Sequence, residues 1–462
     1  MSDRMRAAAL RMGDRGLAAA HRMGDRGLAA ALFAALFVLY NANGREMGNY
    51  DSQPTKYAAR ELLLRGTLAL NHVVGATPQL GERPAFVPAR GGRIRSAYSP
   101  VPAMAAAAIT WPLWIAGVLD VRAPLGANWI AKLTASLLTA GAVALSFFTA
   151  RRFMSGGRAL ALAAALGAGT GYWPTVSQTL WQHETAIFGI SLAVFAFTAR
   201  DLRAAGVLAI GIGLGIAGSS RPQLAPAIIV LLTGVAARVG AIGAWPAAAA
   251  TGACAMALIA ANLSWFGHPM GAMPLLEALH PAVHGTEGTF EPSSGGFAGL
   301  LVSPNRGLLI FSPIVAVATT GLPRAVREGR RAALIWCAIA ASAQYVLYAS
   351  YSVWWAGHTF GPRYMLDALP LLAVLAAAGV ADRRLPRPLL SAMALALAWS
   401  IAVSAAGAFV FPNERWNLHP ADVDRSHARL WDWSDLQIVR AWRSTPSPQN
   451  FSLFVSDNGG SR

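Results

Sequence analysis

Long apolar stretches separated by short loops constrain this chain more than any other feature. Charged residues form 13% of its 462 residues and hydrophobic residues 55%, whereas about a quarter of an ordinary soluble domain is charged. The pattern predicts an all-α polytopic membrane protein. Windows close to the ~20 residues that cross a bilayer lie at about 28–42, 101–119, 128–150, 159–176, 183–199, 204–220, 223–240, 241–262, 306–322, 332–351, 363–381 and 386–411.

The formal net charge of +16 raises the question of a nucleic-acid partner. The basic residues occur in twos and threes between apolar runs, without the continuous basic face that binds nucleic acid. Contact with an anionic membrane explains them better. Cys254 and Cys337 both lie inside apolar runs, so neither a disulfide framework nor a thiolate metal site is predicted.

The basic N-terminal segment, residues 1–27, contains most of a tandem repeat. The sequence RMGDRGLAAA occupies residues 11–20 and again 22–31, and its period of eleven keeps one helical face in phase. An interfacial basic helix and a duplication without a selected role are both compatible with it. No clear small-residue cleavage site follows the first apolar run, so residues 28–41 are interpreted as the core of an uncleaved first span.

The positive-inside rule decides which windows cross the membrane. If all of them crossed, the basic short loops would lie opposite the arginine-rich N-terminus. The conflict disappears if window 101–119 is a juxtamembrane or re-entrant helix. About eleven transmembrane helices then remain, and the basic loops are cytoplasmic. These loops are residues 150–153, 199–203, 323–331 and 381–387.

This topology divides the chain into three parts. A cytoplasmic segment (1–27) precedes a transmembrane module (28–411), and an extracytoplasmic aromatic tail (412–462) follows. The first outer loop, residues 43–127, carries juxtamembrane helices. Further outer segments are residues 181–184, 219–223, 263–305 and 354–364. Because the outer segments hold most of the unusual polar residues, we expect the site to face the extracytoplasmic side of the inner (plasma) membrane.

Asp51 lies just after the first span and just before a helical pattern at residues 55–70. It is either a loop acid or helix cap, or a general base beside a partly desolvated cavity. Glu61, within the helical pattern, is interpreted as a charge on the solvated face.

His183 and Glu184 stand at the outer mouth of a span. Ionisable residues at membrane depth usually mark a pathway or a site. The alternative is an interfacial histidine beside a tryptophan in an aromatic belt. Two adjacent residues are too few for a metal site.

Arg221, Arg306 and Arg363 each stand where an outer loop re-enters an apolar run. One such arginine is compatible with a snorkelling anchor, but three on the outer face require negative partners, and guanidinium groups suit phosphate. We therefore expect them to converge on one phosphate-binding cavity. Trp355 and His358 precede Arg363 and suit the apolar face of a sugar; an aromatic belt is the plain alternative.

The order of several short motifs resembles the membrane-embedded glycosyltransferases of the GT-C type, the group that includes the protein O-mannosyltransferases and the lipid A aminoarabinose transferase. The motifs cover most of the chain. They are YDSQPTKYAARELLLRGTLAL (50–70), SAYSPVPAM (96–104), SQTLWQHETA (177–186), SSRPQL (219–224), LLVSPNRGLLIFSP (300–313) and WWAGHTFGPRYMLDALPLL (354–372).

The resemblance implies an inverting transfer of a sugar from a polyprenyl-phosphate donor in the membrane to a glycan, lipid or protein acceptor. Asp51 would be the catalytic base, and Tyr98, within the second motif, would join the substrate-binding residues. The family often has two adjacent acids where this chain has Asp51 followed by Ser52. This departure favours a mechanism without a metal, so no cofactor is expected.

Two other classes of function remain open. A membrane transporter or lipid flippase also needs polar residues inside a bundle, but such proteins often contain internal repeats with broken helices at the midplane, and no such half-to-half similarity is visible. A structural scaffold would explain the spans but leave the outer arginines without partners. The amphipathic segment 429–442 in the tail is expected to pack on the outer surface as a lid or interfacial segment.

Overall fold

The structure is a computed structural model that describes residues 24–292, 295–381 and 385–455. The first copy of the N-terminal repeat lies outside the described residues, as do Arg383 and Arg384 of the predicted cytoplasmic loops. The second copy continues into the first helix, α2 (Asp25–Asn41).

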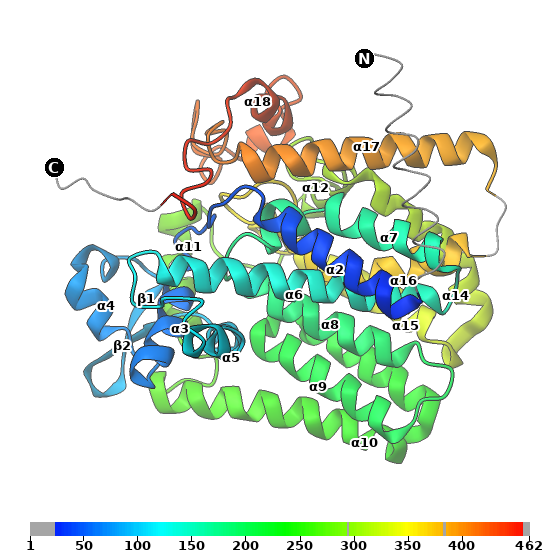
Figure 1. Ribbon diagram of the computed structural model, residues 1–462, viewed down its shortest axis with the longest axis horizontal. Helices are drawn as coiled ribbons and strands as arrows, with labels where there is room; N and C mark the ends of the chain where they lie inside the picture. The colour runs from blue at the N-terminus through cyan, green and yellow to red at the C-terminus, as the bar shows by residue number, and fades with distance from the viewer. Residues whose placement is uncertain (1–23, 293–294, 382–384, 456–462) are drawn as a thin grey trace.

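Apolar helices lie side by side in a bundle (Figure 1). They are α2, α6 (Gly126–Arg151), α7 (Gly156–Ala168), α8 (His183–Phe197), α9 (Ala204–Ser220), α10 (Ala225–Phe266), α15 (Ala333–Ala349), α16 (Leu369–Val380) and α17 (Arg387–Phe409). The other described helices are α3 (Gln53–Arg65), α4 (Asn71–Ala76), α5 (Val101–Ile115), α11 (Met273–His284), α12 (Gly296–Val302), α13 (Leu308–Phe311), α14 (Leu322–Glu328) and α18 (Gln437–Arg443). The expected all-α class is confirmed.

One end of the bundle, called here the arginine end, gathers the basic loops. Arg151 forms an ion pair with Asp25, 2.7 Å from Nε to Oδ1, which joins the end of α6 to the start of α2. Arg152 donates to the Phe195 carbonyl near the end of α8, and Arg238 of α10 donates to the Phe197 carbonyl. Further contacts of this end are Arg158 with the Ala381 carbonyl and Arg324 with the Ala378 carbonyl. The basic loops thus share one end, as the sidedness argument requires.

Two of the expected helical windows are interrupted. Window 306–322 consists of the short α13 followed by a 3-10 segment, η5 (Pro313–Gly321). Window 159–176 ends as an α-helix at Ala168 and continues as a five-residue wide turn, η3 (Tyr172–Val176). Each break contains a proline, Pro313 or Pro174, which has no N–H to continue the helical hydrogen-bond pattern.

The end opposite the arginine end carries α3, α4, α5 and a β-hairpin that the sequence analysis did not predict. Strands β1 (Phe86–Ala89) and β2 (Arg93–Ser96) are antiparallel, with Phe86 opposite Ser96. Helix α3 ends at Arg65, earlier than expected, because Gly66 adopts φ 65°, a left-handed conformation that glycine adopts at little cost. We call this the site end.

Helix α5 is the window that we expected not to cross the membrane. It has 15 residues, the same length as α8, so length does not distinguish it from helices that we expect to cross. It packs on α3, where Ala103 and Ala106 join Ala58 and Ala59 in one apolar cluster.

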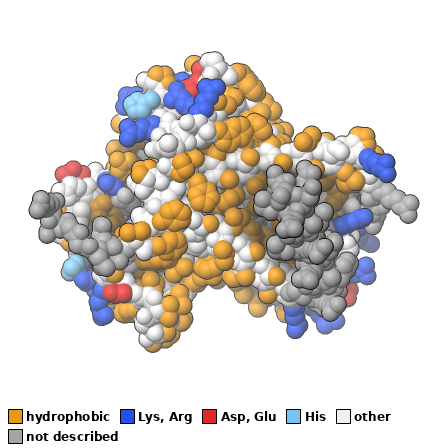
Figure 2. Space-filling view, turned by 45° about the horizontal axis from the view of Figure 1, so that its top comes forward, with side chains coloured by type: hydrophobic (Ala, Val, Ile, Leu, Met, Phe, Trp, Pro, Cys, Tyr) orange, Lys and Arg blue, Asp and Glu red, His pale blue; other side chains and the backbone are white. Residues whose placement is uncertain are grey.

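The outer surface of the bundle is apolar. Ile242 is 94% exposed and Trp245 69%, both on α10, and hydrophobic side chains cover much of the face drawn in Figure 2. Within the described residues, four helices are long and apolar enough to cross a membrane, or five if a pair bent by 113° at residues 331–333 is one span. Shorter apolar helices, among them α7, α8 and α9, complete the bundle.

The tail folds back over the site end. Its 3-10 segment η8 (His427–Trp431) and helix α18 lie beside the end of α17 (Figure 1). Ile438 and Ala441 of α18 are buried against Val403 and Ala406 of α17. Helix α18 therefore packs on α17 through its apolar side chains, while Trp431, Trp433 and Trp442 of the segment are exposed.

Candidate active site

Asp51 stands at the site end, in the turn before α3. The N-terminal cap of α3 is Ser52, so Asp51 is not the cap. Its side chain is 41% exposed. One carboxylate oxygen, Oδ1, accepts a hydrogen bond from the Tyr98 hydroxyl at 2.9 Å, while Oδ2 lies 3.6 Å from Nη1 of Arg363.

Tyr98 holds this carboxylate in place. Burial, together with the nearby Asp51 carboxylate, raises the pKa of the Tyr98 hydroxyl well above its ordinary value. The hydroxyl therefore stays protonated and donates a hydrogen bond to Oδ1. Oδ2 remains the oxygen that can accept a hydrogen bond or a proton from another group.

Arg363 borders Asp51 from the other side. Its guanidinium lies over the Trp181 ring, 4.8 Å from the centroid, and its Nη2 donates to the Ala356 carbonyl at 3.2 Å. Its Nε is buried and makes no hydrogen bond within the described chain. The side chain is 13% exposed, so this arginine keeps donor capacity beside the open carboxylate. Asp51, Tyr98 and Arg363 together are called here the border.

A second, fully buried group of residues lies beneath the border. Asp367 is 0% exposed and lies between two partners: Oδ1 is 2.8 Å from Nδ1 of His183, and Oδ2 is 2.9 Å from Nε of Arg221. Arg221 also donates to the Tyr348 hydroxyl at 2.6 Å. The charge of Arg221 is therefore balanced by a carboxylate inside the protein, whereas the sequence analysis expected a phosphate as its partner.

The contacts of His183 define its protonation. Nδ1 faces the Asp367 carboxylate, so it carries the proton, and Nε2 lies 3.1 Å from Nη1 of Arg221, so it accepts. A donor at Nδ1 and an acceptor at Nε2 describe the neutral imidazole. His183 thus couples Arg221 to Asp367 without adding a charge.

Stacked tyrosines join the two groups. The Tyr348 and Tyr364 rings are nearly parallel, with centroids 4.4 Å apart; Tyr348 contacts Arg221, and Tyr364 follows Arg363 in the chain. Glu184, beside His183, is 0% exposed and neither carboxylate oxygen has a hydrogen-bond partner within the described residues.

Arg306 belongs to a different group of residues. It is 0% exposed, and its five N–H groups all have protein acceptors. These are the carbonyls of Trp355, Asn305 and Gly357 and the side chains of Gln437 and Asn417. With no donor left for a ligand, Arg306 fastens the tail to the loop 352–362. The expectation that Arg306 converges with Arg221 and Arg363 on one phosphate-binding cavity was wrong.

Trp355 and His358 also contact the tail. The Trp355 indole, 2% exposed, donates to Oδ1 of Asp424 at 2.6 Å. His358 Nε2 lies 2.8 Å from Oδ1 of Asp422. Nine residues were expected in the site. The contacts gather Asp51, Tyr98 and Arg363 at the border and His183 and Arg221 beneath it, and Glu184 follows His183 in the chain.

Two other acids of the first outer loop, Glu46 and Glu61, are already paired. Glu46 lies 2.8 Å from the ammonium of Lys56, and both side chains are almost fully buried. Glu61, expected on a solvated face, is 2% exposed and pairs with Arg65 at 2.8 Å. Asp51 is thus more open than either acid, which favours it as a proton acceptor.

Sequence reasoning missed Asp367, Tyr348 and Tyr364. Asp367 lies in the expected span 363–381 and Tyr348 in the span 332–351. A charged residue inside an apolar window is costly and points to a site, so the position of Asp367 was a usable signal. Its partner at residue 221 is visible only in the tertiary structure.

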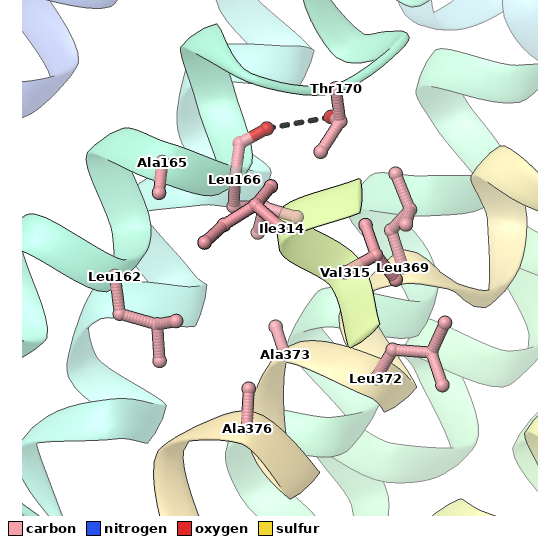
Figure 3. Close-up of a pocket in the computed structure, with 10 residues that line it drawn as sticks. All are labelled: Leu162, Ala165, Leu166, Thr170, Ile314, Val315, Leu369, Leu372, Ala373 and Ala376. Atoms are coloured by element: carbon pink, nitrogen blue, oxygen red, sulfur yellow. Dashed lines mark hydrogen bonds between the residues drawn. The ribbon is translucent and has the colours of Figure 1, made fainter. Parts of the chain in front are cut away.

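A small apolar pocket lies between α7, η5 and α16 (Figure 3). Its lining includes Leu162, Leu166, Ile314 and Leu372, and its one hydroxyl, on Thr170, is bonded to the Leu166 carbonyl at 2.6 Å. No titratable side chain lines it. The pocket is therefore apolar, unlike the group formed by Asp51, Tyr98 and Arg363.

No protein-family description matches the chain, and no curated protein matches it. Among solved structures, it is similar to crystal structures of ArnT from Cupriavidus metallidurans, an aminoarabinose transferase of the GT-C group. The form bound to undecaprenyl phosphate shares 14% identity with a TM-score of 0.48, over 92% of this chain and 76% of that one. The apo form gives 14% identity, a TM-score of 0.46, and 92% and 75% coverage. These two structures come from the same group of enzymes that the sequence motifs resemble.

Proposed function

We propose that this chain is an integral membrane glycosyltransferase that moves a sugar from a polyprenyl-phosphate donor to an acceptor on the extracytoplasmic side. One observation carries the proposal: a half-exposed carboxylate, Asp51, stands 3.6 Å from Nη1 of Arg363, an arginine whose Nε makes no hydrogen bond in the described chain. A base for the acceptor hydroxyl and a cation for the leaving phosphate are the two groups that such a transfer requires.

In the proposed reaction, Oδ2 of Asp51 takes the proton of the acceptor hydroxyl as its oxygen attacks the anomeric carbon. The bond from that carbon to the phosphate oxygen breaks, and the lipid phosphate leaves with the electron pair. Configuration inverts because this is a single displacement. Tyr98 orients the carboxylate through Oδ1.

Arg363 is assigned to the phosphate. A guanidinium placed in advance stabilises the charge that develops on the leaving group without reorganising water. The buried pair of Arg221 and Asp367, together with the stacked Tyr348 and Tyr364, supports the segment that carries Arg363. The apolar pocket near the start of α16 suits part of an isoprenoid chain.

The membrane arrangement is part of the proposal. About eleven segments cross, α5 lies at the outer membrane surface, and the site end faces the exterior, so that the donor enters from the bilayer and the acceptor from outside. The basic residues of the arginine end then lie in the cytoplasm, where the positive-inside rule favours them.

The test is Asp51→Asn in a purified transfer assay with a defined polyprenyl-phosphate sugar. Asparagine keeps the size and the acceptor for Tyr98 but is a poor base, so transfer should fall by about two to four orders of magnitude while donor binding is retained. Asp120→Asn makes the same change at an exposed acid of the same loop and should leave transfer at the parent rate.

One result would count against the assigned base, and another against the function itself. Full transfer by the Asp51→Asn protein would remove Asp51 as the base, and Glu184 would be examined next. Movement of the intact donor across vesicles, without sugar transfer to any acceptor, would favour the flippase reading.

A further inference from the structure

A group of histidine and aspartate side chains lies apart from Asp51, where three outer segments meet. His358 belongs to the loop 352–362, Asp422 and Asp424 to the tail, and His284 to the end of α11. Ligand atoms of His358, Asp422 and Asp424 all lie within 4.8 Å of one another. None of these residues has a role in the proposed transfer chemistry.

Two distances within this group are close to the edges of a metal coordination shell. His358 Nε2 lies 3.4 Å from Oδ2 of Asp424, and His284 Nδ1 lies 3.2 Å from the same Oδ2. Ligand atoms at about 2.0–2.2 Å from one tetrahedral zinc ion stand roughly 3.3–3.6 Å from each other. His358 Nε2 lies closer to Oδ1 of Asp422, at 2.8 Å, so these two ligands must move apart when the ion binds.

The surroundings of Asp424 resemble those of a metal ligand. Its side chain is 5% exposed, and Oδ1 is held by the Trp355 indole at 2.6 Å, which turns Oδ2 toward the two histidines. Ligating carboxylates are commonly oriented by such a second hydrogen bond.

The backbone leaves room for this group. Gly357 has φ +67°, and a Cβ there would lie 3.3 Å from Cε1 of His284 and 3.8 Å from Oδ2 of Asp424. Ala356 before it is also left-handed, at φ 63°. A left-handed conformation is costly for Ala356. It places the Gly357 backbone against His284 and Asp424, and the next residue, His358, contacts Asp422 of the tail.

We propose that His284, His358, Asp422 and Asp424 bind one Zn²⁺ ion, which fastens α11 and the tail to the loop that leads to Arg363. Two imidazoles and two carboxylates form a nitrogen and oxygen ligand set of the kind that zinc accepts. With all four positions supplied by the protein, the site is structural. It stands independently of the proposed transfer activity.

The experiment uses the full chain without a histidine tag, in detergent, stripped with a chelator and then supplied with Zn²⁺ alone. We expect one zinc per chain by elemental analysis, a raised unfolding temperature, and an X-ray absorption spectrum with only nitrogen and oxygen neighbours. A stripped chain that takes up no zinc would overturn the proposal.

Two variants locate the ion. Asp422→Asn keeps Oδ1 for the Asp424 N–H, 2.9 Å away, and His358→Gln removes a ring that is 37% exposed, so both should fold. Each should weaken zinc binding at least about 100-fold and remove the thermal shift. His268→Gln, at a ring bonded to the Met270 N–H, is the matched control. Zinc binding unchanged by both cluster variants would place the ion elsewhere and refute the assignment.

Discussion

At the scale of single residues, Arg306 and Arg363 show that the same side chain serves two purposes. Arg306→Gln should destabilise the protein by about 3 kcal/mol or more, because several buried acceptors lose their donor at about 1–3 kcal/mol each. Arg363→Gln should leave the unfolding temperature near that of the parent but lower kcat/KM about 100-fold or more, the cost of losing a preorganised donor. Thermal unfolding in detergent and the transfer assay measure the two effects. Loss of transfer without loss of stability in Arg306→Gln, together with loss of stability in Arg363→Gln, would contradict both assignments.

At the scale of elements, α10 depends on one glycine. Gly240 divides it into two helices at φ 77° and ψ 165°, a region that is almost closed to other residues. Gly240→Ala should destabilise the protein by about 1–3 kcal/mol through backbone strain alone, because no atom lies within 4 Å of the added Cβ. Gly252→Ala, in the same element with the same open surroundings but helical backbone, should be neutral or slightly stabilising. Equal unfolding temperatures for the two variants would show that the break does not need glycine.

At the scale of the whole molecule, the membrane arrangement depends on whether α5 crosses. Single cysteines replace exposed Thr77 before α5, Asp120 between α5 and α6, and Ser155 after α6, in a chain whose Cys254 and Cys337 are alanine. If α5 stays at the surface, an impermeant thiol reagent should label positions 77 and 120 in intact cells and position 155 only after lysis. Labelling at 77 and 155 with protection at 120 would mean that α5 crosses.

The sequence by itself determined the class of the protein and the approximate place of most helices. Apolar windows and basic loops are local properties, and α9 begins and ends at the expected residues, 204 and 220. The sequence also singled out Asp51 and Arg363, because polar residues beside apolar runs stand out in a membrane protein, and the family resemblance added Tyr98. The hairpin β1–β2 and the break into α13 and η5 were missed, since short turns and proline positions override the hydrophobic pattern.

Only the tertiary structure decided which charges meet. Asp367 and Arg221 are 146 positions apart, and His358 and Asp422 are 64 apart, separations that no local pattern reports. Arg221 and Arg306 looked alike in the sequence, since each follows a short polar run at the start of an apolar one. Packing gave the first a buried carboxylate and the second five neutral acceptors, because a buried cation must find its partners within the fold.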